Sequence, residues 1–138
     1  MRLPCGQQRR SYAPARCERA YKDKKLTPDG PTHSPVSADP GPADCPFCAI
    51  ARGEDRSVTV VCEDESWIAF FPPEPATPGH TLVIPRAHAP DLWSMSIDGS
   101  AELMTAVLRV GRAITRALAP EGMNLISSSG QALSLIHI

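Results

Sequence analysis

Two cysteines near the middle of the chain are the residues whose type and spacing point most directly to chemistry. They stand two residues apart in the run Cys45-Pro46-Phe47-Cys48. A tight turn of this kind can aim both sulfurs at one tetrahedral ion, and Zn²⁺ binds thiolate sulfur at about 2.3 Å in that geometry. Two ligands do not complete a metal site, so a pair of reduced, half-buried thiols is the alternative interpretation.

The same four residues are also similar to the reactive dithiol of glutaredoxin-like oxidoreductases. That chemistry requires the first cysteine at the N-terminus of a helix, directly after a buried strand. Here the preceding residues 39–44 read Asp-Pro-Gly-Pro-Ala-Asp, and no strand can end in such a segment. Metal binding is therefore favoured over redox catalysis.

A second informative run covers residues 78–88 and reads Pro-Gly-His-Thr-Leu-Val-Ile-Pro-Arg-Ala-His. Together with the cysteine pair it resembles the histidine-triad (HIT) family of nucleotide hydrolases and transferases. The resemblance covers roughly residues 44–132 and ends where the family's catalytic motif, an alternating His-x-His-x-His strand, should begin. We therefore expect a nucleotide-binding domain that lacks the nucleophile of its family.

This resemblance divides the chain into three parts. Residues 1–44 hold seven prolines among scattered charges and show no periodicity, so we expect a disordered, Pro-rich and basic leader. Residues 45–132 correspond to a partial HIT domain. Residues 133–138, Leu-Ser-Leu-Ile-His-Ile, look like the translation of a transposon-end adapter used in sequencing libraries, so His137 is not a catalytic candidate. A short β-forming tail is the alternative.

The resemblance implies a structural Zn²⁺ and a supporting histidine. In zinc-bearing members a histidine just after the third strand is a third ligand, and His88 occupies that position beside Cys45 and Cys48. The fourth ligand comes from the first histidine of the absent motif. His80 matches a histidine that supports the catalytic one by hydrogen bonding. A lone strand histidine is more often structural, and even in the functional interpretation His80 would support the catalytic histidine without reacting itself.

The resemblance also implies a site for a purine nucleotide or nucleotide conjugate. Its candidate residues are Phe47, Ile50, Phe70 and Pro73 around the base and Ser128 near the phosphate. Stacking of a base on such side chains is physically reasonable, although each is equally suited to an ordinary core. Pro72 stands where the family has an aspartate that holds the ribose hydroxyls, and proline has no side-chain acceptor to replace it.

The implied function is hydrolysis or transfer of a nucleotidyl group. In the family the middle histidine of the motif attacks the α-phosphorus and forms a nucleotidyl-histidine intermediate, which water or a second substrate resolves. We expect this activity of the full-length protein and no activity of the present chain. The alternative is a non-catalytic zinc-binding interaction module. Family members commonly dimerise through the long helix and a sheet edge, so we expect a homodimer of the full-length protein.

The local patterns predict an α+β fold with an antiparallel sheet, one long helix, a short N-terminal helix and a missing C-terminal strand. The short helix is expected over residues 48–52, capped by Asp44 and ended by Gly53. Strands are expected over residues 58–62, 67–71, 80–84 and 123–127, and a helical turn over residues 91–95. Four prolines between residues 72 and 78 require a loop before the third strand.

The long helix can be capped by Asp98 or Ser100 and ends at residues 120–122. Its larger apolar residues recur at spacings of three and four, which predicts one core-facing side. These residues are Leu103, Met104, Val107, Leu108, Gly111, Ile114 and Leu118. Arg109, Arg112 and Arg116 fall outside that side and are expected on a solvated face.

Charge and composition limit the remaining function classes. Residues 1–25 hold eight Arg or Lys against Glu18 and Asp23, a charge of +6 that leaves −7 for the rest of a chain with net charge −1. No interleaving of aromatic and basic residues supports nucleic-acid binding, so none is expected. An odd number of cysteines argues against a disulfide framework and favours the cytoplasm. No apolar run reaches the ~18 residues of a membrane span.

Overall fold

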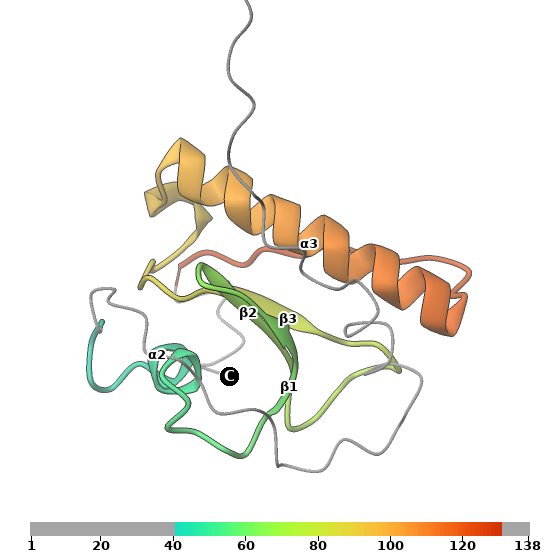
Figure 1. The fold of residues 1–138 in the computed structure, drawn as a ribbon, viewed down its shortest axis with the longest axis horizontal. Helices are drawn as coiled ribbons and strands as arrows, with labels where there is room; N and C mark the ends of the chain where they lie inside the picture. The colour runs from blue at the N-terminus through green and yellow to red at the C-terminus, as the bar shows by residue number, and fades with distance from the viewer. Residues whose placement is uncertain (1–40, 131–138) are drawn as a thin grey trace, which may run out of the picture.

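The structure, a computed structural model, describes residues 41–130 (Figure 1). In chain order its elements are α2 (Pro46–Ala51), β1 (Thr59–Glu63), β2 (Trp67–Phe71), β3 (Leu82–Pro85), the 3₁₀ turn η1 (Leu92–Ser94) and α3 (Ile97–Leu118). They confirm the predicted α+β class. The leader up to residue 40 and the tail from residue 131 lie outside the described residues, and the disorder expected of the leader remains a prediction.

The three strands form one antiparallel sheet in the order β1-β2-β3. Thr59 pairs with Phe71 across the first ladder, and Ile68 pairs with Ile84 across the second. The register between β1 and β2 shifts near Val61, as it does at a β-bulge. Strand β2 has the bounds that its β-branched and aromatic residues predict, because a central strand is specified by its own apolar run.

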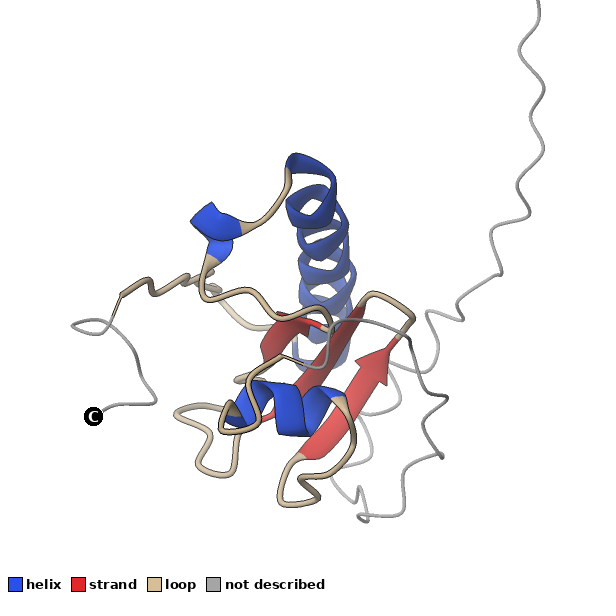
Figure 2. Ribbon diagram, turned by 90° about the vertical axis from the view of Figure 1, so that its left-hand side faces the viewer, coloured by secondary structure: helices blue, strands red, loops and turns tan. Residues whose placement is uncertain are grey.

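Helices cover the sheet on both faces, with α3 across one face and α2 against the other (Figures 1 and 2). Trp67 and Ala69 of β2 belong to the apolar cluster that contains the inner side of α3. Ile68 and Phe70 point the other way and pack with Ile50 of α2. Since both faces of β2 are covered, four successive apolar residues are buried instead of alternating with polar ones.

Helix α3 begins at Ile97, about one turn before the start that a cap at Ser100 would give. Ser96 is the N-cap, and its side chain accepts a hydrogen bond from Gly99 N–H at 3.1 Å. Asp98 lies inside the first turn, where its negative charge suits the positive end of the helix dipole. The helix ends at Leu118, and its C-cap Ala119 adopts the left-handed conformation before Pro120.

The core-facing side of α3 is rotated away from the side predicted by its large apolar residues. The buried residues are the smaller Ala106, Val110 and Ala113. Met104 and Leu108 are instead 39% and 53% exposed. Small residues let the helix approach the sheet closely, whereas a count of large side chains gives alanine no weight. The predicted apolar side is therefore wrong in part. Because Met104 and Leu108 face outward, α3 carries an apolar stripe on its outer surface.

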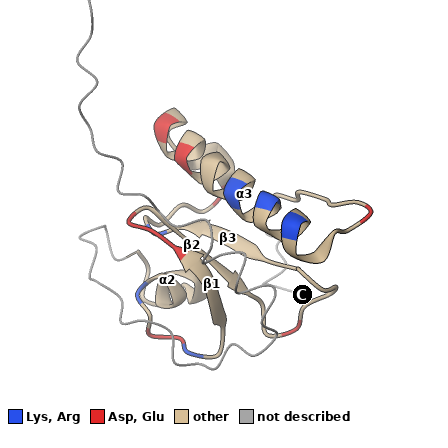
Figure 3. Ribbon diagram, turned by 45° about the vertical axis from the view of Figure 1, so that its right-hand side comes forward, with Lys and Arg blue, Asp and Glu red and all other residues tan. Residues whose placement is uncertain are grey.

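The charges of α3 are separated along its length (Figure 3). Asp98 and Glu102 lie in its N-terminal half, and Arg109, Arg112 and Arg116 lie in its C-terminal half. All five side chains are exposed, which confirms the solvated face expected for the arginines. This order of charges also complements the helix dipole.

Three local predictions are corrected by the structure. The N-cap of α2 is Cys45 without a side-chain hydrogen bond, and Asp44 does not cap the helix because Pro46 already occupies its first position. His80 precedes β3 and is not part of it. Residues 123–127 are not a strand. A strand needs a hydrogen-bonded neighbour as well as apolar residues, and none pairs with this segment in the described part of the chain.

Other local predictions are confirmed. Gly53 has a φ of 74° after α2, and the proline-rich stretch before β3 is a loop. The turn η1 is capped by Asp91, whose side chain accepts from Ser94 N–H at 2.9 Å. Within residues 41–130, no helix combines the length and the apolar character needed to cross a membrane.

Candidate metal centre and nucleotide face

The structure brings Cys45, Cys48 and His88 together. Their ligand atoms all lie within 4.8 Å of one another. Cys48 Sγ and His88 Nδ1 are 3.2 Å apart. Cys48 is buried, Cys45 is half-buried and the His88 ring is exposed. A group predicted from one sequence motif and a family position is thus assembled from segments that are far apart in the chain.

Helix α2 positions the two sulfurs. Cys45 is its N-cap and Cys48 lies three residues later, so one helical turn places both side chains on the same side. Gly53, Glu54 and Asp55 close the helix with backbone hydrogen bonds to Ile50 and Ala49. His88 comes from a different element, the loop that follows β3.

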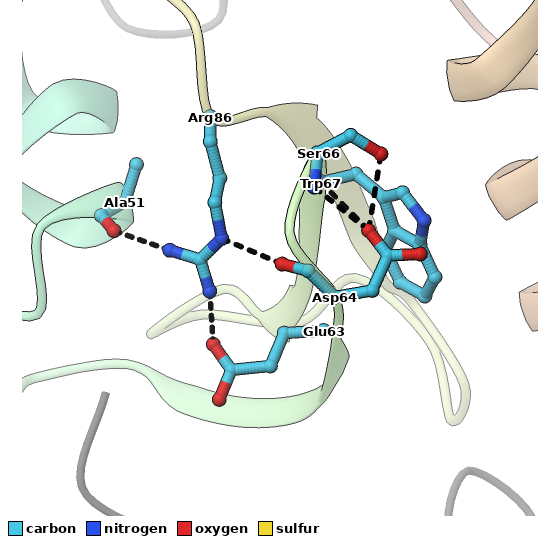
Figure 4. Close-up of polar contacts among 6 residues, drawn as sticks. All are labelled: Ala51, Glu63, Asp64, Ser66, Trp67 and Arg86. Carbon is cyan, nitrogen blue, oxygen red and sulfur yellow. Dashed lines mark hydrogen bonds and ion pairs between the residues drawn. The ribbon is translucent and has the colours of Figure 1, made fainter. Parts of the chain in front are cut away.

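Arg86 connects the histidine loop to the cysteine helix (Figure 4). Its Nη1 donates to the carbonyl oxygen of Ala51, the last residue of α2, at 2.5 Å. Its Nε donates to the carbonyl oxygen of Asp64 at 2.8 Å, and its Nη2 pairs with the carboxylate of Glu63. A guanidinium offers several donors in a rigid plane, so one side chain can bond three acceptors on two different segments at once.

Asp64 holds the turn between β1 and β2, to which Arg86 is hydrogen-bonded. One carboxylate oxygen accepts from Ser66 N–H at 2.9 Å, from the Ser66 hydroxyl at 3.1 Å and from Trp67 N–H at 3.2 Å (Figure 4). Sequence reasoning did not single out Arg86 or Asp64. The available signal was an arginine directly after the apolar strand, two residues before the proposed ligand His88.

The donor set fits Zn²⁺. Two thiolates and one imidazole are ligands that zinc accepts in structural sites, and hard cations such as Mg²⁺ prefer oxygen. Bond lengths of about 2.0–2.3 Å around a tetrahedral ion separate its ligand atoms by roughly 3.3–3.8 Å. The Cys48 and His88 atoms already stand near that separation. Zinc, when bound, would be held here by Cys45, Cys48 and His88 and would join α2 to the loop after β3.

Arg52 adds positive charge beside the two thiols. Its pKa is raised, first by the hydrogen bond from its Nε to Glu54 at 2.9 Å and to a smaller extent by the charges of Glu54, Cys48 and Cys45. The same hydrogen bond lowers the pKa of Glu54. Both side chains are exposed enough to be screened by solvent, so the pair matters for the local potential more than for stability.

Three of the proposed nucleotide residues also come together. Phe47 and Ile50 of α2 pack with Phe70 of β2 on the sheet face opposite α3. The Phe47 and Phe70 ring centroids are 6.4 Å apart and the rings are tilted by 54°. Phe70 and Ile50 are buried, whereas Phe47 is half-buried and offers accessible ring surface. Pro73 and Ser128 are exposed and are not among the residues packed on this cluster.

His80 has a defined orientation. Its Nδ1 accepts a hydrogen bond from Ala76 N–H at 3.0 Å, and its own backbone N–H donates to Thr77 O at 3.0 Å. An Nδ1 atom that accepts carries no proton, so the neutral ring has its proton on Nε2. The remaining ring nitrogen is therefore a donor, which is the form a supporting histidine needs.

His88 also lines a cavity of about 440 Å³. It is bounded by the end of β3, the turn η1 and the first turns of α3, and its polar lining includes Glu65, Arg86, Ser94 and Glu102. Phe47, Ile50 and Phe70 do not line it. The cavity is thus separate from the apolar surface proposed for the base.

The model of one protein family, described as the HIT domain, matches residues 54–138. The chain belongs to the HIT family. It is 36% identical over 88 residues to an uncharacterized HIT-like protein of Saccharolobus solfataricus. The matched region makes up 64% of this chain and 63% of that protein. The chain is 32% identical over 87 residues to the adenosine 5'-monophosphoramidase hnt1 of Schizosaccharomyces pombe, covering 63% and 62% of the two chains.

Solved structures support the same fold. A crystal structure of a HIT family protein from Bacillus anthracis superposes with a TM-score of 0.62 at 32% identity, covering 66% of this chain and 64% of that one. The antiparallel sheet with its helices is therefore a HIT fold. The chain spans 45% to 63% of the length of the first curated relatives that it matches.

Proposed function

We propose that this HIT domain binds a purine nucleotide conjugate and that the full-length protein hydrolyses or transfers its nucleotidyl group. The observation that carries the proposal is the apolar cluster of Phe47, Ile50 and Phe70 on the α2 face of the sheet. The name of the Schizosaccharomyces pombe relative, an adenosine 5'-monophosphoramidase, supports the class of substrate. Membership of the HIT family alone would not separate a hydrolase from a transferase.

The proposed reaction proceeds in two steps. A histidine of a His-x-His-x-His strand in the full-length protein attacks the α-phosphorus, the bond to the leaving group breaks, and a nucleotidyl-histidine forms. Water or a second acceptor then attacks the same phosphorus and releases the histidine. In this proposal His80 has a positioning role, because its Nε2–H can donate to a neighbouring ring while Ala76 holds Nδ1.

The nucleotide contacts of this chain differ from those of its family in two places. Pro72 leaves the ribose hydroxyls without the usual carboxylate, and Ser128 offers a shorter side chain to the phosphate than asparagine does. Binding would therefore depend more on the base than on the sugar. Phe47 is the candidate with accessible ring surface, so it is the residue on which the proposal is best tested.

Replacement of Phe47 by alanine should weaken binding of adenosine monophosphate by roughly 5- to 150-fold, since stacking on an aromatic ring contributes about 1–3 kcal/mol. Isothermal titration calorimetry on the 138-residue chain measures this effect. Trp93→Ala is the matched control, because Trp93 is an exposed aromatic on η1 and should leave affinity unchanged. Equal affinities for wild type and Phe47→Ala would count against the proposed base site.

We also propose that Cys45, Cys48 and His88 hold one structural Zn²⁺. A chain extended with a family C-terminal strand should purify with about one zinc per subunit, and Cys48→Ser should lose it, because a structural tetrahedral site tolerates few missing ligands. The present chain offers three ligands and should bind zinc more weakly. Metal analysis of the purified proteins gives the answer, with Trp93→Ala again as control. Identical zinc contents in wild type and Cys48→Ser would exclude Cys48 as a ligand.

A non-catalytic zinc-binding module is the second candidate function. The assembled cysteine-histidine group favours it, because that group is present here while the His-x-His-x-His motif does not occur in the printed sequence. The coding sequence of the full-length protein decides between the two. A continuation that encodes the triad supports the enzyme, and a full-length protein without it supports the binding module.

The full-length protein is proposed to be a homodimer. Support comes from the outer side of α3, where Ile97 is 87% exposed and Met104 and Leu108 follow it along the same stripe. Acidic residues flank the first half of the stripe and arginines flank the second, so two antiparallel copies of α3 would place opposite charges together (Figure 3). Sedimentation velocity on the full-length protein tests this assembly.

A further inference from the structure

Gly41 lies against two of the proposed zinc ligands. A Cβ atom built on Gly41 would stand 2.5 Å from Cys48 Sγ and 2.9 Å from His88 Cβ. Contacts under 3.0 Å are essentially never seen for real Cβ atoms, so the close approach is possible only for glycine. The backbone at residue 41 therefore touches a ligand from α2 and a ligand from the β3 loop at the same point.

The segment that carries Gly41 is tied to the start of α2. Pro42 O accepts a hydrogen bond from Cys45 N–H at 3.1 Å, which closes a turn directly before the helix. Gly41 itself has a φ of 64°, in the left-handed region that glycine adopts without strain. Pro42 restricts its own φ and so reduces the freedom of this turn. Gly41 is thus held over the ligands by its neighbours and does not merely lie near them.

We propose that Gly41 is a positioning residue of the metal centre. Its backbone closes over Cys48 and His88 and fixes the direction of the thiolate and the imidazole toward a common ion. The inference rests on the proposed zinc site. The proposal extends the zinc site to a residue that precedes the cysteine pair. Gly41 and both cysteines lie before residue 54, where the match to the HIT domain begins.

The size of the clash decides the expected effect. To reach an ordinary contact, a Cβ at residue 41 must displace Cys48 Sγ by about 1 Å and His88 by about 0.5 Å. Ligand distances in zinc sites vary by only about 0.2 Å, so a shift of that size separates the ligands from one ion. Loss of outer contacts that orient metal ligands typically lowers metal affinity by about 10- to 100-fold. We expect a loss in that range for Gly41→Ala.

Gly130 provides a matched control for backbone strain. It has a φ of 81°, but a Cβ built there meets nothing within 4 Å. Gly130→Ala therefore introduces a similar left-handed alanine without a clash. Gly41→Asn is the second variant, because asparagine tolerates the left-handed conformation better than alanine yet carries the same Cβ. A clash predicts equal zinc loss for Gly41→Ala and Gly41→Asn, whereas strain predicts a milder effect for asparagine.

The experiment uses the 138-residue chain with Zn²⁺ and Co²⁺ as probes. Zn²⁺ affinity is measured by competition with a chromophoric chelator, and the Co²⁺ spectrum reports thiolate ligation and tetrahedral geometry. Gly41→Ala and Gly41→Asn should bind Zn²⁺ about 10- to 100-fold more weakly than wild type and lose the tetrahedral Co²⁺ absorption. Gly130→Ala should match wild type. Circular dichroism should show that the metal-free Gly41 variants are folded, with melting temperatures lowered by the left-handed side chain and the contact with Cys48 but still above room temperature.

The Cys48→Ser variant distinguishes an error in the proposed zinc site from an error in the proposed role of Gly41. If Cys48→Ser binds Zn²⁺ as well as wild type, the zinc site itself is wrong. If Cys48→Ser loses Zn²⁺ but Gly41→Ala and Gly41→Asn retain it, the zinc site stands and the role of Gly41 is overturned. Failure of both Gly41 variants to fold without metal also overturns it, because Gly41 would then belong to the fold and not to the metal centre.

Discussion

The 138-residue chain should give no measurable turnover of adenosine 5'-phosphoramidate or of dinucleoside polyphosphates. The covalent mechanism proposed above uses a histidine nucleophile, and removal of the nucleophile from a covalent enzyme can lower kcat by about 10⁶-fold. The chain contains four histidines, and no two of them are separated by a single residue. In the proposed site His80 is a positioning residue and His88 a zinc ligand, so neither replaces the nucleophile.

A chain extended with a His-x-His-x-His strand is the positive control and should recover turnover. The ratio of the two rates, measured by release of adenosine monophosphate, gives the contribution of the missing motif. His137→Ala in the unextended chain is the second control. Substantial activity of the unextended chain that disappears in His137→Ala would show that residue 137 acts in catalysis and is not part of an adapter-derived tail.

Replacement of Arg86 by alanine should lower the free energy of unfolding by about 3 kcal/mol, because it leaves the Glu63 carboxylate and two carbonyl oxygens without their donor. The Arg86 side chain is only 9% exposed, so water replaces these bonds poorly. For a domain of this size the melting temperature should fall by roughly 10–20 °C. Thermal and urea unfolding followed by circular dichroism measure both quantities.

Arg109→Ala is the matched control for that prediction. Arg109 reaches the same turn, with Nη1 at 3.8 Å from Asp64 Oδ2, but its side chain is 44% exposed. A loose, solvated pair of this kind contributes about 0–1 kcal/mol, so Arg109→Ala should be close to wild type. Arg86→Lys should remain destabilised, because one ammonium cannot bond three acceptors in a plane. Comparable losses for Arg86→Ala and Arg109→Ala would contradict the assigned role of Arg86.

Local sequence patterns determined the elements of this domain and their order. Strand β2 and the turn η1 were predicted because apolar runs, proline and capping residues act over a few neighbouring positions. The cysteine pair and His88 could be named as ligands because the spacing within one motif and a family position specify them. Resemblance also placed Phe47, Ile50 and Phe70 near one another, and the structure confirms that they are neighbours.

Contacts between distant segments were decided only by the tertiary structure. The inner side of α3 depends on how closely its alanines approach β2, and residues 123–127 lack a partner strand in the described part of the chain. Arg86 gave only a weak local signal, its place directly after the apolar strand, because its acceptors on Ala51 and Glu63 are remote from it in sequence. Gly41 gave none, because one of the two residues that it approaches, His88, is equally remote. Short-range patterns report which local structure a segment prefers. A donor shared by several acceptors, or a position without a Cβ, matters only when folded segments meet.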